Sequence, residues 1–506
     1  MTLPKGWTKA MLGEFTLERV EQGEPGQSAV SYIDIGSIDR DLKRVGPTEK
    51  VTGVNAPTRA RQWVKPGDVL VSLTRPNLNA VALVTPDLDG AVASTGFDVL
   101  RPQGILPEWV FNRVRSQAFV SDVCEGVQGV VYPAIRPAAV RRHDLPIPPI
   151  QEQRRIVDAI DSYLTRLDDA LASLERAQTK LKAYRASVLK AAVEGRLVPT
   201  EASVARAEKR VYERAEVLLA RILKERRRRW EEAELSNVKV AGRAPKVDAW
   251  KAKYEEPVAP DTSALPELPE GWCWASLELM KEFSLYGPRF SSDDYSEEGV
   301  LVLRTSDISE AGRVDLATPP RLKLAHEEFE RYQAKRGDLL ITRTGSLGTL
   351  AVLDDEVRAI AGAYLIQYRL AAPTETTWYC FYFLKSPRAQ MQLVQRGQGV
   401  GRPNLNVPTI DSILIPLPPL AEQARIIDEI QRLTSVSDEL AVQMRADLQR
   451  GARLRQAVLK WAFEGKLVDQ DPSDEPAEKL LARIQAERAD DSLSKKSLAR
   501  KTRGAA

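Results

Sequence analysis

Few side chains in this sequence are of the types that carry out catalysis. The two histidines, His143 and His326, lie at unrelated positions, and neither has other ligand residues at metal-binding spacing. The three cysteines, Cys124, Cys273 and Cys380, are scattered and form no CxxC pair, which predicts a reducing cytoplasm and no disulfide framework. We therefore expect both histidines to be satisfied or exposed side chains without a catalytic role.

Motifs for nucleotide and methyl-donor chemistry are also absent. The sequence contains no GxxxxGK[ST] phosphate loop and no Asn-Pro-Pro-aromatic tetrapeptide of the amino-methyltransferases. Asp68 and Asp338 each follow a glycine and could suggest acidic sites, but an aspartate in a turn that enters a strand is commoner. No partner acid or lysine stands at a nuclease spacing, so these motifs predict no catalytic site for methyl transfer or cleavage.

Polar residues of the types that contact nucleic acids gather in loop-like stretches of both halves. Arg, Lys, Asn and Gln read base edges, whereas Arg, Lys, Ser and Thr hold phosphates. Loops that follow aligned strands are reasonable places for such contacts, although most polar side chains on any protein surface are simply solvated. The basic run 226–229 is more typical of a solvated helix face than of a base-reading site. The candidate DNA-binding residues are Arg59, Arg61, Arg75, Asn77, Asn79, Gln128, Tyr132, Arg343, Thr344, Ser346, Gln398, Arg402, Asn404 and Asn406.

The composition is that of a soluble globular protein. The chain has 506 residues, 28% charged and 43% hydrophobic, which suggests three or four domains. No apolar run is long enough to cross a membrane, and the opening MTLPKGWTKAM lacks the core of a signal peptide. The net charge is only +3, so binding to nucleic acid requires basic residues concentrated on one face, or basic partners.

The elements that position these residues are revealed by an internal repeat. The stretch 145–198 (LPIPPIQEQRR…EGRLV) returns as 415–468 (IPLPPLAEQAR…EGKLV), with a constant offset of 270 residues. A repeat of this length determines the architecture. Each copy begins with prolines that cannot continue a helix backwards and ends at Gly195 or Gly465, where a C-cap glycine is expected, which predicts a helix of about 45 residues, roughly 70 Å long.

Apolar residues in each long helix recur in steps of 4 and 3, the heptad pattern of a coiled coil. We expect the two helices to pack against each other as an antiparallel pair. In the second helix Ser437, Asp447 and Gly451 interrupt the pattern, and Leu448 is expected to replace Asp447. The predicted seams are Ile156, Ile160, Tyr163, Leu167, Ala170, Leu174, Ala177, Leu181, Tyr184, Val188 and Ala191, and then Ile426, Ile430, Leu433, Ser437, Leu440, Met444, Asp447, Gly451, Leu454, Val458 and Trp461.

A globular segment precedes each helix, and a shorter helix follows it. Short apolar runs separated by Gly and Pro predict mixed α/β domains; LPKGW and KPGDVLVS of the first return as LPEGW and KRGDLLIT in the second. The block 215–226 resembles 477–488 and predicts a further amphipathic helix in each half. The expected fold is α+β: domains at 1–147 and 266–417, helical regions at 148–230 and 418–490, a linker at 231–265, a basic tail at 491–506, and pseudo-two-fold symmetry between the tandem halves.

These motifs resemble the DNA-specificity subunits of Type I restriction–modification enzymes. The resemblance is carried, twice and in the same order, by LPxGW, GDxL, the Pro-Pro-apolar-x-Glu-Gln helix entry and the VLKxAxEGxLV exit, and it covers nearly the whole chain. The family implies two target-recognition domains, each reading one half of a split, asymmetric DNA site, and helices that set the spacer between the half-sites.

The same resemblance implies partners and cofactors. The helices would dock two methyltransferase subunits, and the assembly would take on two motor–nuclease subunits, while S-adenosylmethionine, ATP and Mg²⁺ would bind those partners and not this chain. A non-catalytic protein of the prokaryotic cytoplasm is expected. Two alternatives are a coiled-coil scaffold without a DNA role and a DNA-binding relative that works outside a restriction complex, and a pull-down for a methyltransferase would separate them.

Overall fold

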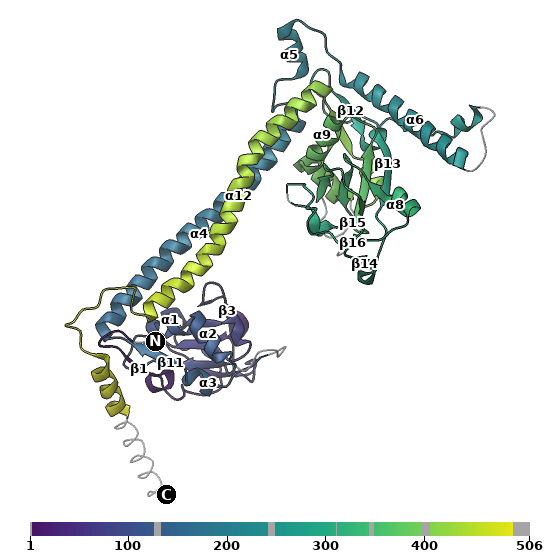
Figure 1. Cartoon of the computed structure of the whole chain (residues 1–506). Coiled ribbons are helices and arrows are strands. Elements are labelled where there is room, and N and C mark those ends of the chain that lie inside the picture. Colours follow the sequence, from purple (N-terminus) through teal and green to yellow (C-terminus); the bar gives the residue numbers. More distant parts are fainter. Residues whose placement is uncertain are drawn as a thin grey trace. The chain divides into compact units, whose positions relative to one another are not determined.

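The computed structural model describes residues 3–125, 133–240, 248–309, 311–343, 349–396 and 405–488. These form two compact units, coloured along the sequence in Figure 1. Unit 1 comprises Met1–Glu175 with Arg445–Ala506, and unit 2 comprises Arg176–Met444. Each unit therefore holds one globular domain and a part of each long helix.

The first domain, in unit 1, combines an antiparallel sheet and a mixed sheet with helices. The sheets have strand orders β10-β7-β8 and β5-β2-β9-β6, and two small pairs, β1-β11 and β3-β4, complete the domain. Its elements are β1 (Thr8–Met11), β2 (Val30–Ile33), β3 (Ile38–Asp39), β4 (Arg44–Val45), β5 (Glu49–Val51), β6 (Ala60–Trp63), β7 (Val69–Ser72), β8 (Val81–Leu83), β9 (Val92–Ser94), β10 (Phe97–Leu100), α1 (Pro107–Val114), α2 (Gln117–Val123), α3 (Pro137–Arg141) and β11 (Asp144–Ile147).

The second domain, in unit 2, follows the same plan. Its sheets have orders β13-β21-β18-β19 and β14-β16-β15-β20-β17, with the pair β12-β22 beside them. Its elements are β12 (Cys273–Ser276), α7 (Leu277–Met280), β13 (Lys281–Tyr286), β14 (Tyr295–Ser296), β15 (Val300–Leu303), β16 (Arg321–Leu322), α8 (His326–Tyr332), β17 (Gln333–Ala334), β18 (Leu339–Thr342), β19 (Leu350–Val352), β20 (Ala359–Ala361), β21 (Leu365–Leu370), α9 (Thr374–Lys385), α10 (Pro387–Arg396), α11 (Val407–Asp411) and β22 (Leu414–Leu417).

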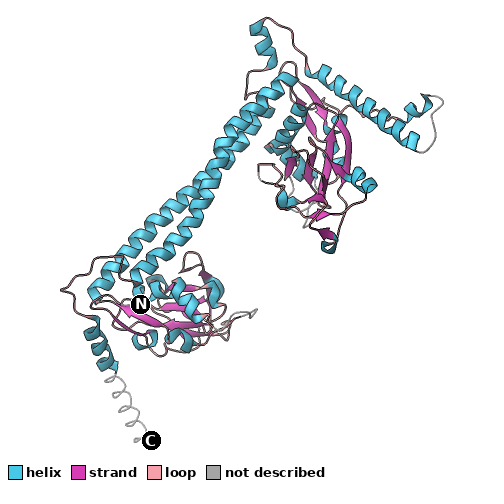
Figure 2. Ribbon diagram, in the orientation of Figure 1, coloured by secondary structure: helices cyan, strands magenta, loops and turns pink. Residues whose placement is uncertain are grey.

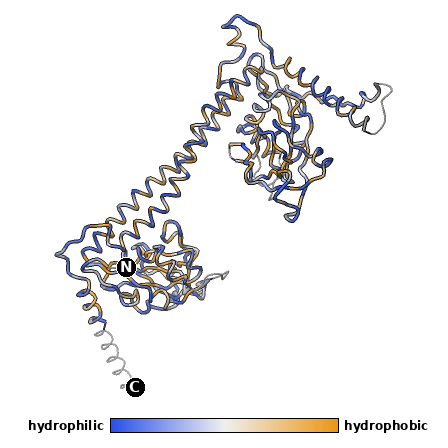
Figure 3. The backbone as a smooth tube through the Cα atoms, in the orientation of Figure 1, coloured by the Kyte–Doolittle hydropathy of each residue, from blue (hydrophilic) through white to orange (hydrophobic). Residues whose placement is uncertain are grey.

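The strands at the centre of each domain are apolar on both faces, since alternate residues belong to different core clusters. Hydrophobic segments, orange in Figure 3, run through both domains. β7 and β18 are buried along their whole length, because helices cover one face and the second sheet packs on the other. In unit 1 the core includes Trp109, whose ring lies 5.9 Å from that of Trp7 and 4.4 Å from that of Phe463. Phe463 belongs to the second long helix, so the helix and the domain share one core.

The two long helices, α4 (Ile150–Val193) and α12 (Leu420–Phe463), pack side by side (Figures 1 and 2). In unit 1, Arg455 forms an ion pair with Asp168. In unit 2, Arg185 forms one with Asp438 at 2.5 Å. The partner number falls as the number along α4 rises, so the helices run antiparallel, which confirms the prediction.

The predicted seam is partly wrong, because the buried face is rotated by about one residue. Leu164, not Tyr163, is buried, and Tyr163 is 50% exposed. Leu440 and Leu454 are also exposed, at 46% and 43%. The physical reason is that the helices pack on their domains as well as on each other: Leu164 lies in the core of the first domain, and this contact turns the helix away from a simple heptad seam.

Ala170, Tyr184 and Trp461 are exposed as well, so the prediction is also wrong at these three positions. The other predicted seam positions that are buried or half-buried are Ile156, Ile160, Leu167, Leu174, Ala177, Leu181, Val188, Ala191, Ile426, Ile430, Leu433, Met444, Asp447 and Val458. Gly451, which interrupts the heptad pattern, is buried because it faces a large partner: a Cβ there would lie 2.5 Å from Cδ2 of Leu171. Ser437, another interruption, is buried and accepts a hydrogen bond from Arg185 at 2.9 Å.

The exit glycines of the long helices adopt positive φ, as predicted for C-cap positions. Gly195 and Gly465 have φ values of 66° and 67°. Each also lies against a proline of an LPxGW motif, because a Cβ would come within 2.6 Å of Pro269 and 2.4 Å of Pro4, respectively. Any larger residue would therefore meet both backbone strain and a clash.

A shorter helix closes each unit. In unit 1 the helical residues 477–488 pack on the first domain, where the Ala477 amide donates to the Gly6 carbonyl at 2.9 Å. In unit 2, α5 (Glu201–Glu208) is followed by α6 (Ala215–Val240), and the Ala215 amide donates to the Gly271 carbonyl at 2.8 Å. The helix that follows each long helix thus packs on the domain of the other repeat.

The predicted linker at 231–265 begins too early, because α6 continues through its first ten residues. Ion pairs Arg227–Glu231 and Arg228–Glu232 join successive turns across the expected boundary. Trp230 also stacks on Trp250, with ring centroids 6.0 Å apart, beside a short 3-10 helix at Asp248–Lys253. The chain after α6 is therefore folded back against it.

Candidate nucleic-acid interface

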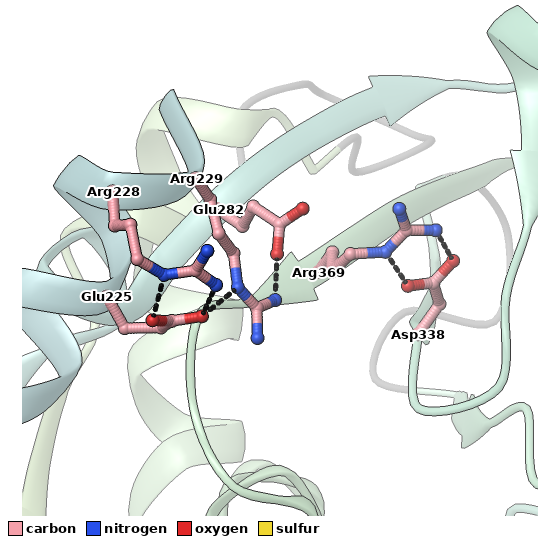
Figure 4. Close-up of polar contacts among 6 residues, drawn as sticks. All are labelled: Glu225, Arg228, Arg229, Glu282, Asp338 and Arg369. Atoms are coloured by element: carbon pink, nitrogen blue, oxygen red, sulfur yellow. Dashed lines mark hydrogen bonds and ion pairs between the residues drawn. The ribbon is translucent and has the colours of Figure 1, made fainter. Parts of the chain in front are cut away.

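The aspartates of the two GD motifs are structural. Asp68 accepts two hydrogen bonds of 2.7 Å from Arg101, and Asp338 accepts two, of 2.5 and 2.6 Å, from Arg369 (Figure 4). Both carboxylates are buried, and each also caps a turn by accepting the amide of the lysine three residues earlier. This bidentate pairing holds the entrance of the central strand, in agreement with the prediction of a turn aspartate.

Each central strand leads into a loop that is clamped in the same way in both domains. After β7, the Leu73 amide donates to Gly96 at 2.9 Å and its carbonyl accepts from Ile135 at 2.8 Å. After β18, Arg343 makes the same two bonds, to Tyr364 at 3.0 Å and from Leu405 at 2.8 Å. Leu73 and Arg343 are one repeat apart, so the backbone frame is preserved although the side chains differ.

In the first domain this loop holds three of the predicted DNA-binding residues. Arg75 and Asn77 are exposed, and Arg75 has φ 49° and donates its amide to Pro133 at 2.7 Å. Asn79 has φ 46°, and its carbonyl accepts from Nζ of Lys43 at 2.6 Å. Its side-chain oxygen Oδ1 is buried without a partner among the described residues. The structure therefore brings Arg75, Asn77 and Asn79 together in one rigid turn.

The two arginines of the TRARQW run differ in environment. Arg59 is exposed at the start of β6. Arg61 is half-buried and forms an ion pair of 2.9 Å with Glu24. Because the Glu24 carboxylate already pairs with the Arg61 guanidinium, Arg59 is the better placed of the two arginines to contact an external phosphate.

In the second domain, two of the predicted residues are described. The guanidinium of Arg343 lies 4.7 Å from the ring centroid of Tyr286, and its Nε is buried without an acceptor among the described residues. Asn406 accepts the Thr409 amide at 2.9 Å and caps α11, which gives this side chain a structural role. Seven other candidates lie outside the described residues, namely Gln128, Tyr132, Thr344, Ser346, Gln398, Arg402 and Asn404.

A polar cleft beside Arg343 was missed by sequence reasoning. It has a volume of about 380 Å³ and lies where β13, β15 and β20 end, between Arg289, Arg304 and Tyr364. Its lining contains no carboxylate. Arg304 is oriented by Asp307 at 2.8 Å, a hydrogen bond that raises the pKa of this arginine, whereas Arg289 and Tyr364 are exposed. The signal in the sequence was the segment GPRF, which carries Arg289 and directly follows the strand KEFSLY.

The basic run of α6 is occupied by neighbouring carboxylates. Arg228 and Arg229 both bind Glu225, and Arg229 also binds Glu282 of β13 (Figure 4). The hydrogen bonds from the two arginines lower the pKa of Glu225 to about 2. The pair Arg229–Glu282 attaches α6 to the second domain, whereas the pairs with Glu225 lie within α6.

The two histidines lie in different environments. His143 is buried, its Nε2 accepts from Nε of Arg113 at 2.8 Å, and its Nδ1 is bonded to Asp122. Burial lowers the pKa of His143, and the adjacent guanidinium lowers it further. His326 is exposed at the start of α8. The described residues hold no group of three or more His, Cys, Asp or Glu side chains suited to a metal ion, and no helix among them is long and apolar enough to span a membrane.

The comparisons with known proteins agree with this architecture. Residues 286–450 match the family model "Type I restriction modification DNA specificity domain". The chain is 24% identical over 512 residues to the EcoKI specificity subunit of Escherichia coli strain K12, an alignment that covers 96% of each protein. It is 27% identical over 362 residues to the EcoBI specificity subunit of Escherichia coli, covering 68% of this chain and 64% of that relative.

A solved chain from a type I R-M system, in a study of complex assembly and conformational transition, superimposes with a TM-score of 0.65. The two are 25% identical, and the match covers 92% of this chain and all of the other. The duplicated domain, the antiparallel helices and the sequence matches therefore agree with one another. On this evidence the chain is similar to the DNA specificity subunits of Type I restriction–modification enzymes along nearly its whole length, and its residues 286–450 match the specificity domain of that family.

Proposed function

We propose that this chain is the DNA-binding subunit of a Type I restriction–modification complex and that each domain reads one half of a bipartite, asymmetric site. The observation that carries the proposal is the pair of loops at Leu73 and Arg343, clamped by the same backbone hydrogen bonds but bearing different side chains. A duplicated frame with diverged loops suits the reading of two different half-sites.

The antiparallel helices would set the spacing of the half-sites. Each domain shares its core with both long helices, so the position of a domain follows the length of the helices. Leu171 of α4 and Gly451 of α12 face each other. Inserting seven residues after each of them lengthens the helix pair by about 10 Å. We expect a spacer about three base pairs longer and unchanged half-sites, since stacked base pairs are about 3.4 Å apart.

Catalysis would come from partners. The proposed assembly contains two methyltransferase subunits and two motor–nuclease subunits, which would carry S-adenosylmethionine, ATP and Mg²⁺. This chain would contribute the DNA address and the docking surfaces of its helices, and it would act with DNA in the prokaryotic cytoplasm.

The experiment that tests the proposal is methylation-sensitive sequencing of DNA from cells that express this chain with its cognate methyltransferase. We expect one split motif with a fixed non-specific gap. Exchange of residues 266–417 for those of another family member should change one half of the motif and leave the other intact. A bound methyltransferase without any modified motif would contradict DNA addressing and favour a scaffold role, whereas a motif without a gap would contradict the two-domain reading.

A further inference from the structure

Three positively charged residues recur at equivalent positions where each domain meets the long helices. One lies on a hairpin of the domain, one at the C-terminal end of a domain helix and one on a long helix, and we name them the junction cations. The offset is the same 270 residues for all three, although the surrounding domains have diverged. The pairs are Lys43 and Arg313, Arg115 and Lys385, and Arg455 and Arg185.

In unit 2 the junction cations line a groove of about 840 Å³ between the second domain and the long helices. Arg313 is exposed on a hairpin whose Gly312, at φ 81°, lies directly on the ring of Phe381, so that the hairpin is seated on α9. The groove wall also includes the aromatic rings of Trp378 and Tyr382. The hairpin thus places the Arg313 guanidinium in the wall of a groove that is large enough for a charged ligand.

In unit 1 the hairpin residue is Lys43, at φ 54°, whose Nζ bonds to the carbonyl of Asn79 in the candidate DNA-binding loop. Burial lowers the pKa of Lys43; the negative charge of Asp41 opposes this, and the positive charges of Arg115 and Arg455 lower the pKa further. Burial likewise lowers the pKa of Arg115 to about 10. The Arg115 guanidinium packs over the ring of Phe111 at 4.7 Å. These cations therefore lie together, partly desolvated, next to the candidate interface.

Among the described residues, neither hairpin cation, Lys43 or Arg313, forms an ion pair with a carboxylate, although the charge of Asp41 acts on Lys43. The carboxylate that recurs in both units is bound to the long-helix arginine, as Asp168 to Arg455 and Asp438 to Arg185. In unit 2, Asp354 and Asp355 also line the groove, and Asp354 is paired with Arg336 at 3.3 Å. A hairpin cation without its own ion pair can be neutralised by a bound anion.

The repetition itself indicates which anion. Base contacts must differ between two domains that read different sequences, whereas the phosphate backbone presents the same charge to both. Positions that keep a cation in both diverged domains therefore suit a sequence-independent contact. We propose that the junction cations of each unit bind a backbone phosphate of the duplex beside the half-site, so that the long helices contact DNA as well as setting its spacing. This inference rests on the proposed function.

The test uses the chain in complex with its cognate methyltransferase, and duplex DNA with and without the methylated motif. The variants are Lys43→Gln, in which the amide can still donate to the Asn79 carbonyl, and Arg313→Gln. Binding is measured by fluorescence anisotropy over a range of salt concentrations. Each variant should weaken binding to both duplexes roughly tenfold and reduce the salt slope by about 0.9, the value for one lost phosphate contact.

Controls separate this contact from a general loss of charge. Lys50→Gln and Lys323→Gln remove one charge from exposed sites of the same domains and should leave the slope unchanged. Lys43→Arg keeps the charge and should keep the slope. The methylated motif should be the same for every variant.

Three outcomes would overturn the proposal. The phosphate contact would be excluded if the salt slope were unchanged in Lys43→Gln and Arg313→Gln. Base reading would be indicated if the variants weakened binding only to the motif-bearing duplex. A protein interface would be indicated if the variants lost methyltransferase binding while the remaining complex bound DNA normally. If the wild-type complex does not prefer the motif-bearing duplex, the proposed function itself fails. This result is distinguishable from the three outcomes above, which concern the variants alone.

Discussion

Trp272 donates its indole N–H to the buried carboxylate of Glu422 at 3.1 Å, and Trp7 makes the same bond to Glu152 at 3.0 Å. The tryptophan belongs to the LPxGW opening of each domain and the glutamate to the first turn of the following long helix. The two most recognisable motifs of each repeat are therefore partners in one buried hydrogen bond, which fixes the direction in which the helix leaves its domain.

Trp272→Phe should destabilise unit 2 by about 1–3 kcal/mol, because it leaves a buried carboxylate without one of its donors. Burial already raises the pKa of Glu422, and loss of the indole should raise it further. Chemical denaturation followed by circular dichroism measures the change. The control is Trp274→Phe, which removes an indole bond to Pro266 at a more exposed site and should change stability much less. Equal effects would contradict a special role for the buried pair.

The corrected inner face of the long helices is tested by two leucines of unit 1. Leu164→Ala should cost about 2–5 kcal/mol, because Leu164 is only 7% exposed and belongs to the core. Leu454→Ala should change stability by less than about 0.5 kcal/mol, since that side chain is 43% exposed. Thermal denaturation of both variants would decide, and the reverse order of the two effects would restore the simple heptad seam.

The packing of Gly451 against Leu171 predicts a size exchange. Gly451→Leu should destabilise the helix pair by about 1–3 kcal/mol through overpacking, because even a Cβ would lie 2.5 Å from the leucine. Adding Leu171→Ala should recover much of the loss by vacating the space that the new side chain needs. The melting temperatures of both single variants and the double variant provide the test, and additive losses would show that the two positions do not share one space.

Arg289 in the cleft of the second domain should contact the DNA that this domain reads. Arg289→Gln, expressed with the cognate methyltransferase, should lower methylation or alter only the half-site assigned by exchange of residues 266–417. Methylation-sensitive sequencing gives both readouts. Arg321→Gln, an exposed arginine of the same domain, is the control. A change in the other half-site would contradict this assignment.

The ion pairs that Glu225 forms within α6 should weaken in acid. The pKa of Glu225 is lowered to about 2 by Arg228 and Arg229, below its ordinary value near 4.5. A lowered folded-state pKa means that the stabilisation is complete above about pH 5 and is lost as the pH falls toward 2. The stability difference between wild type and Glu225→Gln should therefore be constant at neutral pH and shrink below pH 4.5. It should stay under about 1 kcal/mol, because the pairs are solvent-exposed.

The sequence by itself determined the order of the elements, because local patterns encode them. The 270-residue repeat, the proline entries before Ile150 and Leu420, the exit glycines and the GD turns predicted both long helices, both domains and the structural role of Asp68. Periodicity, capping and turn chemistry act over a few residues, so they can be read along the chain.

The tertiary structure decided what depends on residues far apart in the sequence. The rotation of the helix faces, which buries Leu164 and exposes Leu440, follows from packing against the domains and not from the heptad pattern. Asn406 was a candidate reader by type, but Thr409 occupies its oxygen, and Arg61 is paired with Glu24. Whether a polar side chain is engaged or available depends on partners that only folding brings near, and for this reason the junction cations became visible only in three dimensions.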